Sequence, residues 1–150
     1  MANVRMLLSA LLLILSSAAV AELTPFEDYE FSEAVYTVDT IKVKPSAGDH
    51  YLEGLKATWS ASQEIAKKLG HIEDYAIYSS ITPESGHFNL MLVTKFKNLA
   101  ATAPSKAKRD AWLKEMGAAK AKAGNKRALE NYPELREITG SYIMNEITFK

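Results

Sequence analysis

The chain has 150 residues, with 18 basic and 18 acidic side chains and no cysteine. Its length suits one domain with a sizeable core, and the balanced net charge indicates no particular class of partner. The absence of cysteine excludes disulfides, thiolate zinc sites and lipid attachment at a cysteine.

The N-terminal residues have the features of a secretory signal peptide. Arg5 precedes an uncharged apolar run, Met6–Val20, and residues 19–21 (Ala-Val-Ala) supply the small-x-small pattern that signal peptidase accepts. The run is shorter than the ~20 residues needed to span a bilayer, so we expect cleavage before Glu22 rather than a retained anchor. The sequence therefore predicts an exported protein, periplasmic or extracellular, with no stable membrane anchor once residues 1–21 are removed.

An acidic arm follows at residues 22–33, where carboxylates are interleaved with aromatic side chains. Pro25 and the density of charge argue against a regular element in this arm, whereas the aromatic residues favour docking on a surface. We place a single domain directly after the arm, over residues 34–150.

The first half of this domain is predicted to be a strand and a helix. Val35–Val43 is rich in β-branched and aromatic residues, and Pro45 ends it. Ser46 and Asp49 have the spacing of a capping box, so a helix should follow and end before Gly70. Its predicted buried stripe consists of Leu52, Leu55, Trp59, Ser62, Ala66 and Leu69.

Two strands are predicted next, over Tyr75–Ile81 and Phe88–Phe96, joined as a hairpin by the turn cluster at residues 82–86. The second strand has apolar residues at both parities, as is typical of a strand buried on both faces. The Ala and Lys content of Ser105–Ala123 predicts a second helix, which Gly124-Asn125 should end.

The last segment is predicted to resume helix over Lys126–Tyr132, to turn at Glu134–Ile138 after Pro133, and to finish in a strand at Ser141–Phe149. The order is then strand, helix, strand, strand, helix, strand. With right-handed crossovers this gives an α+β, ferredoxin-like fold: a four-stranded antiparallel sheet with both helices on one face. The other sheet face is bare and partly apolar, so we expect a second copy to cover it as a homodimer.

Three segments resemble the dimeric α+β barrel superfamily. Residues 41–59 (IKVKPSAGDHYLEGLKATW) are similar to its first strand, Pro-containing turn and first helix. Residues 88–101 (FNLMLVTKFKNLAA) are similar to its third strand and following loop, and residues 134–147 (ELREITGSYIMNEI) to its last strand. The resemblance implies a ferredoxin-like barrel of the antibiotic-biosynthesis-monooxygenase or stress-responsive type, with a ligand pocket between sheet and helices.

The superfamily includes cofactor-independent monooxygenases, haem-degrading monooxygenases and polyketide cyclases, so the fold does not choose an activity. Haem-degrading members use a histidine on the second helix, and residues 105–123 contain none. The cyclase-type strand histidines also have no counterpart. The resemblance therefore implies no cofactor for this chain.

Three histidines are the natural candidates for proton transfer near neutral pH. His71 lies at the junction of the first helix with the next strand, His50 in the first helical turn and His87 at the hairpin. The alternative is that all three are ordinary surface residues. No metal-ligand spacing, serine nucleophile elbow or Gly-rich phosphate loop occurs, so no metal site is predicted.

Two carboxylates are predicted in the middle of strands, Asp39 in the first and Glu146 in the last, and the topology makes these strands neighbours. Either is a candidate catalytic acid or base, with a pKa raised by burial. The alternative is that each is paired with Lys42, Lys95 or a tyrosine hydroxyl.

Five further residues are candidates for binding a ligand: Trp59 on the helix stripe, and Tyr36, Tyr78, Tyr142 and Asn145 in strands. Their rings could wall an aromatic pocket between sheet and helices. The alternative is core and interface packing.

A basic stretch, residues 104–127, holds eight Lys and Arg against two acids. It suits a solvated helix face, partly neutralised by the acidic arm of the same chain, or docking on an anionic surface. We adopt the solvated face and expect no nucleic-acid partner.

Two functions from different classes remain open. One is an exported homodimer that holds a small apolar or aromatic molecule without catalysis. The other is a cofactor-independent monooxygenase or isomerase, in which His71, Asp39 or Glu146 moves a proton on a small aromatic substrate. A cavity that holds a carboxylate together with a histidine would favour the enzyme.

Overall fold

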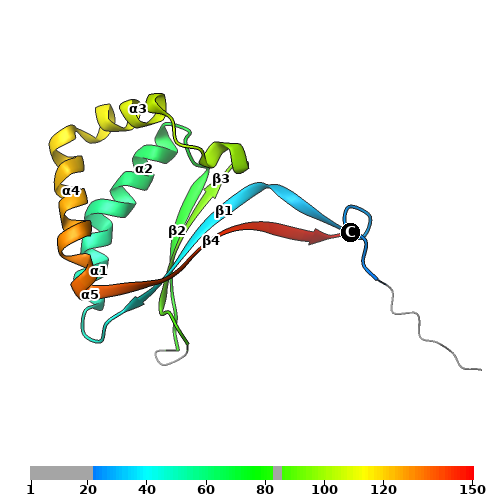
Figure 1. Ribbon diagram of the computed structural model, residues 1–150, viewed down its shortest axis with the longest axis horizontal. Coiled ribbons are helices and arrows are strands. Elements are labelled where there is room, and N and C mark those ends of the chain that lie inside the picture. The colour runs from blue at the N-terminus through cyan, green and yellow to red at the C-terminus, as the bar shows by residue number, and fades with distance from the viewer. Residues whose placement is uncertain (1–21, 83–85) are drawn as a thin grey trace, which may run out of the picture.

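The computed structural model describes residues 22–82 and 86–150. A four-stranded antiparallel sheet, in the order β2-β3-β1-β4, carries the helices on one face (Figure 1). The predicted ferredoxin-like α+β order is therefore confirmed, while the predicted signal peptide lies outside the described residues. The elements are β1 (Tyr29–Val43), α1 (Gly48–Leu55), η1 (Lys56–Ser60), α2 (Ala61–Lys68), β2 (Asp74–Ser79), β3 (Leu90–Phe96), η2 (Leu99–Thr102), α3 (Lys106–Met116), α4 (Ala118–Glu130), α5 (Tyr132–Leu135) and β4 (Arg136–Phe149).

The core lies between the sheet and the helices. Ile41 of β1 is opposite Leu90 of β3, and both contribute buried side chains to one apolar cluster with Leu55 of α1. Burying a side chain of this size contributes about 1.5–3 kcal/mol relative to leaving it exposed. Tyr51 and Tyr132 complete the cluster, so the helical layer is fixed to the sheet through aromatic as well as aliphatic contacts.

The first helix differs from its prediction in its start and in its buried face. Ser46 has a positive φ of 64°, and the N-cap is Ala47 with no side-chain hydrogen bond, so the predicted capping box is wrong. Tyr51 is 1% exposed whereas Leu52 is 43% exposed. Tyr51 takes the inner position because its ring packs edge-on against Tyr132, 5.1 Å between centroids. A π-helical turn, η1, then separates α1 from α2.

The predicted second helix is interrupted at Gly117 and not at Gly124-Asn125, where the sequence predicted its end. Gly117 has a φ of 81°, which glycine adopts without a steric penalty, and it separates α3 from α4. Gly124 lies inside α4, where a Cβ atom would be 3.6 Å from Cγ2 of Thr58 in η1. Gly124 therefore faces η1 at an ordinary van der Waals distance, with room for a methyl group. At the start of α3, Ser105 accepts a hydrogen bond from the Lys108 backbone, as a cap should.

Strand β4 begins at Arg136, so the predicted turn at Glu134–Ile138 is wrong in its second half. Arg136 is paired with Val43, and the register shifts by one residue at Thr139, between the pairs Thr40–Gly140 and Ile41–Ile138. This bulge lets the strand pairing continue through Gly140, the glycine that suggested the end of a turn.

Strand β1 begins at Tyr29 rather than at Val35, so the acidic arm is partly regular. Beyond the edge of the sheet, residues 29–31 pair with 147–149 and form a projecting two-stranded ribbon (Figure 1). Asn145 Nδ2 donates to the carbonyls of Ser32, at 3.0 Å, and Ala34, at 3.3 Å, which holds the irregular part of β1. The prediction missed this strand because charged side chains are tolerated where both faces meet solvent.

The ribbon also separates the acidic arm from the basic helices. Figure 1 shows it pointing away from α3 and α4, and Glu30 pairs with Lys150 at the C-terminal end, 2.6 Å between Oε1 and Nζ. Neutralisation of the basic stretch by the arm of the same chain is therefore wrong. On the helices themselves, Lys106 pairs with Asp110 and Lys126 lies 3.8 Å from Glu130, which is how a solvated face behaves.

The sheet face opposite the helices carries apolar side chains in the described structure. Val38, Val93 and Met91 lie along its centre, beside Tyr142 and Met144 of the edge strand, which are 54% and 52% exposed. This is the partly apolar open face that the sequence predicts. No helix in the described ranges is both long and apolar enough to cross a membrane.

Candidate functional site

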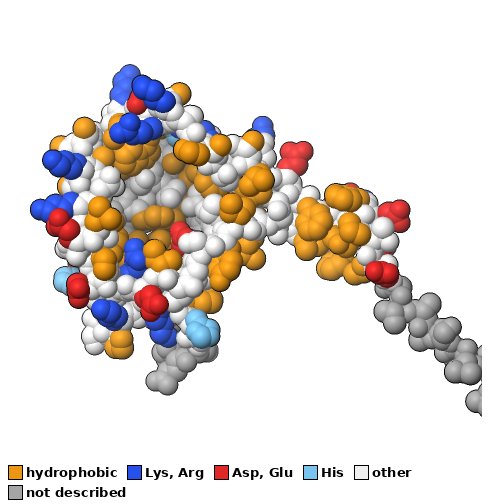
Figure 2. Space-filling model, in the orientation of Figure 1, with side chains coloured by type: hydrophobic (Ala, Val, Ile, Leu, Met, Phe, Trp, Pro, Cys, Tyr) orange, Lys and Arg blue, Asp and Glu red, His pale blue; other side chains and the backbone are white. Residues whose placement is uncertain are grey.

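A pocket of about 290 Å³ opens between the sheet and the helical layer. Figure 2 shows it as a hollow in the body of the molecule, with apolar side chains inside. Ile41, Leu55 and Leu92 contribute to its floor, and Trp59 and Trp112 to its walls. These are both of the tryptophans in the chain. Trp112 is held in place by a hydrogen bond from Nε1 to the Ser62 carbonyl, 3.3 Å.

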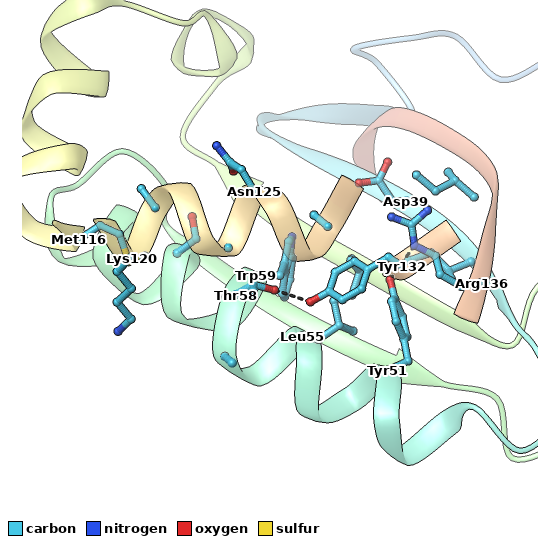
Figure 3. A pocket seen from close by; sticks show the side chains of 18 of the residues that line it. Asp39, Tyr51, Leu55, Thr58, Trp59, Met116, Lys120, Asn125, Tyr132 and Arg136 are labelled. Atoms are coloured by element: carbon cyan, nitrogen blue, oxygen red, sulfur yellow. Dashed lines mark hydrogen bonds between the residues drawn. The ribbon is translucent and has the colours of Figure 1, made fainter. Parts of the chain in front are cut away.

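A contact between the buried Tyr132 and the half-buried Thr58 forms one side of the pocket. The hydroxyls of Thr58 and Tyr132 are 2.6 Å apart, and the Thr58 hydroxyl also donates to the Gly54 carbonyl at 2.8 Å (Figure 3). Because a threonine hydroxyl has one proton, the Tyr132 hydroxyl is the donor to Thr58. A Cβ atom at Gly54 would lie 2.9 Å from Cε1 of Tyr132, so a side chain there would displace the ring.

Arg136 lies at one end of the pocket, against both buried tyrosines (Figure 3). Its Nε donates to the Tyr51 hydroxyl at 3.1 Å, and its guanidinium carbon lies 5.9 and 5.8 Å from the ring centroids of Tyr51 and Tyr132. Burial raises the pKa of the Tyr51 phenol above its ordinary value, although the Arg136 guanidinium acts in the opposite direction. The phenol therefore stays protonated, and it accepts from the guanidinium while the rings fix its plane.

Asp39 lies at the same end of the pocket as Arg136 (Figure 3). It comes from the middle of β1, opposite Ser141 of β4, and its Oδ1 accepts a hydrogen bond from the Ser141 hydroxyl at 2.5 Å. Neither Lys42 nor Lys95, its suggested partners, forms an ion pair with it in the described structure. The carboxylate is thus oriented by a neutral hydroxyl and not by an ion pair with either lysine.

The sequence-based candidates fall into three places. Asp39 and Trp59 both line the pocket between the sheet and the helices. Tyr36 and Tyr78 line a shallow concavity of about 270 Å³ on the open sheet face. Tyr142 is on that face as well, paired with Val38. The aromatic residues proposed together for one pocket therefore occupy opposite sides of the sheet.

The remaining candidates lie outside the pocket between sheet and helices. Glu146 accepts a hydrogen bond from the Tyr36 hydroxyl at 3.4 Å, which is the tyrosine partner named as an alternative for it. The Asn145 side chain donates hydrogen bonds to the backbone of the irregular part of β1. His71 is half-buried at the end of α2, and its backbone N–H donates to Ala66 at 2.8 Å.

The pocket contains a carboxylate without a histidine. None of the histidines of the described ranges is among its lining residues. His50 borders a separate hollow of about 130 Å³, with its Nδ1 3.8 Å from Glu53. The described residues also contain no group of His, Cys, Asp and Glu that could hold a metal ion. The arrangement can bind an apolar molecule and present Arg136 and Asp39 to it at one end, with Lys120 as a second cation among the lining residues away from them.

Three residues at the polar end were missed from the sequence. Tyr51 occurs four residues before Leu55, so the helical periodicity allowed it as an inner residue in place of Leu52. Tyr132 was predicted as the last residue of a helix, and Arg136 as part of the turn at Glu134–Ile138. No local pattern marks an arginine whose partners are rings from α1 and α5.

Comparison of the sequence with protein-family models and with curated proteins gives no match. Solved structures are similar in fold. A protein from Shewanella oneidensis is 14% identical, with a TM-score of 0.52, and the match covers 80% of this chain and 98% of that one. A NIPSNAP family protein of unknown function from Agrobacterium tumefaciens is 18% identical, with a TM-score of 0.49 and coverage of 79% and 92%. A dimeric protein with a ferredoxin-like fold from Bacteroides fragilis is 15% identical, with a TM-score of 0.40 and coverage of 80% and 99%.

The Shewanella similarity shows the fold. The ferredoxin-like α+β architecture that the sequence suggests is confirmed by the strand order of this chain itself. At such identities a shared fold carries no activity from one protein to another, so function has to be argued from the pocket.

Proposed function

We propose that this chain is an exported homodimer that binds a small apolar or aromatic molecule in the pocket between its sheet and helices. The observation that carries the proposal is the pocket itself, whose volume of about 290 Å³ is bounded by both tryptophans and an aliphatic floor. Pockets that bind small molecules combine such apolar walls with a few convergent polar groups. Arg136 and Asp39 are polar groups of this kind.

Native mass spectrometry of the purified full chain tests the binding proposal. We expect a bound small molecule, and we expect its loss in Ala128→Leu, because Ala128 lines the pocket and three added carbons would occupy it. Leu129→Ala is the matched control, since Leu129 is 77% exposed on the same helix. Retention of the molecule by a folded Ala128→Leu variant would place it elsewhere and contradict the proposal.

The homodimer is proposed from the open sheet face. Its central apolar side chains lie together on one face of the sheet, which a second copy related by a two-fold axis would cover with the same residues. Sedimentation velocity at micromolar concentration should give a dimer, and Val93→Glu should give a monomer. Ile81→Glu, which changes a loop side chain that is 97% exposed, should leave the dimer intact. A monomeric wild-type protein would contradict this part.

Export is proposed from residues 1–21 alone. N-terminal sequencing of the protein recovered from the periplasmic and extracellular fractions should give a chain that begins at Glu22. A cytoplasmic chain that begins at Met1 would contradict the proposal.

A second candidate function is a cofactor-independent monooxygenase or isomerase, favoured by the position of Asp39 in the pocket. In this candidate, Asp39 accepts a proton from an aromatic substrate. With the molecule identified by mass spectrometry, turnover that is lost in Asp39→Asn would select this candidate over simple binding.

A further inference from the structure

Arg136 presents unused hydrogen-bond donors at the polar end of the pocket. Its Nε is occupied by Tyr51, and the two aromatic contacts hold its plane in place. No carboxylate of residues 22–82 and 86–150 forms an ion pair with it. A guanidinium has five N–H donors in a rigid fork, so most of its donors remain for a ligand.

Asp39 presents an unused acceptor at the same end. Ser141 occupies Oδ1, whereas Oδ2 accepts no hydrogen bond from the described residues. Figure 3 shows the carboxylate and the Arg136 guanidinium beside one another above the apolar part of the pocket. The two groups do not form an ion pair, which leaves each of them available to a third group.

A donor cation and an acceptor anion at one end of a pocket discriminate between ligand groups. A carboxylate on the ligand would be attracted by Arg136 but repelled by Asp39, and an ammonium would meet the opposite combination. A hydroxyl group satisfies both, because its oxygen accepts from the guanidinium while its proton is donated to the carboxylate. Hydrogen bonds to charged groups are stronger than those between neutral groups, so this end of the pocket should favour a hydroxyl over a carboxylate or an ammonium substantially.

We propose that the pocket binds an uncharged, planar aromatic molecule through a hydroxyl group that is shared between Arg136 and Asp39. The inference rests on the proposed binding function and names the ligand class. The aromatic walls accept a flat ring, and a volume of about 290 Å³ suits one or two rings. This volume lies just below the ~300–1,000 Å³ range of pockets for drug-sized molecules, which suits a smaller ligand.

The two tryptophans make the pocket directly observable. Both Trp59 and Trp112 line it, so the tryptophan emission of the full chain, excited at about 295 nm, reports on its occupancy. Three probes share one ethylbenzene body: 4-ethylphenol, ethylbenzene and 4-ethylbenzoate. At neutral pH they offer a hydroxyl, no polar group and a carboxylate.

For the wild-type protein we expect 4-ethylphenol to bind about tenfold more tightly than either other probe, a difference of about 1.4 kcal/mol. Equal or weaker binding of 4-ethylphenol, with ethylbenzene still binding, would overturn the inference and leave the proposed function standing. If no probe changes the emission, the proposed function fails together with the inference.

Asp39→Asn tests the role of the carboxylate. Its carbonyl still accepts from Ser141, but an NH₂ group replaces the free acceptor and the negative charge is lost. We expect 4-ethylphenol to bind five- to tenfold more weakly and 4-ethylbenzoate more tightly, so that the preference reverses. Asp49→Asn, an identical change at an exposed position of α1, should leave the three probes in the wild-type order of affinity. An unchanged order in Asp39→Asn would overturn the inference, and the wild-type comparison decides it even if that variant fails to fold.

Discussion

Replacing Thr58 by valine removes a single hydroxyl from the wall of the pocket and keeps the shape of the side chain. The hydroxyl accepts from Tyr132 at 2.6 Å, and Tyr132 is only 4% exposed. In Thr58→Val the Tyr132 hydroxyl therefore still has a proton to donate, but the oxygen that accepted it is gone. A buried donor left without a partner costs about 1–3 kcal/mol. Because Tyr132 borders the pocket, water can partly replace the acceptor, and we expect a loss of about 1–2 kcal/mol.

Urea denaturation followed by far-UV circular dichroism measures this loss. With a slope of about 2 kcal/mol/M, the unfolding midpoint should fall by about 0.5–1 M. Thr148→Val is the matched control, because Thr148 is exposed near the end of β4, and it should change the free energy of unfolding by less than about 0.5 kcal/mol.

A double-mutant cycle with Tyr132→Phe separates the lost hydrogen bond from other effects. Removing both hydroxyls leaves no orphaned donor, so the double variant should be more stable than the sum of the single losses by about 0.5–1.5 kcal/mol. Strictly additive losses, or a Thr58→Val variant as stable as the wild type, would refute the assignment of Tyr132 as the donor to Thr58.

Three further outcomes are expected. Gly117→Ala should lower the free energy of unfolding by about 1–2 kcal/mol because its φ of 81° suits glycine, whereas Gly48→Ala, with open space around it, should be neutral or slightly stabilising in the same urea titration. The hydrogen bond to Glu64, with burial, raises the pKa of Tyr75 to about 12. The folded state thus holds this proton more tightly than the unfolded state, so the stabilisation is complete below pH ~10 and is lost as the pH rises to ~12. Tyr75→Phe should therefore flatten the decline in stability measured across that window, and an unchanged decline would contradict the cause assigned to the shift. Asn145→Ala should speed hydrogen exchange of the β1 amides at residues 29–34 and leave residues 90–96 unchanged, since only the former depend on its side chain.

The strand order could be predicted because its signals are local. Val35–Val43 and Phe88–Phe96 show β-branched and apolar runs bounded by turn residues. The first lies within β1, and the second matches β3 except that the strand begins two residues later, at Leu90. The positive φ of Gly70, 68°, likewise follows from a glycine after a helical pattern. The errors in the fold concern glycines and the ends of elements. Gly124 suggested a helix end, but it lies inside α4, where it faces Thr58 from a distant part of the chain.

The site was only partly predictable for the same reason. Asp39 and Trp59 stood out as a carboxylate in a strand and an aromatic on a helix stripe, and both line the pocket. Arg136 could not be found, because its role depends on Tyr51 and Tyr132, which are brought together only by the fold. Tyr36 was assigned to the same pocket as Trp59, although strand parity sends it to the other face of the sheet.

The π-helical turn η1 has a consequence for how the pocket tolerates change. A π turn bonds each residue to the fifth one along, so it holds about one residue more than an α-helical turn. Deleting Ala57 would let this turn wind as an α-helix with one residue fewer, so α1 and α2 would keep their present faces toward the sheet. The wider turn thus accommodates one residue without reorienting the helix that follows it. A chain shortened by one residue at this turn is therefore expected to keep the same helical layer, whereas the same deletion inside α1 or α2 would rotate that helix.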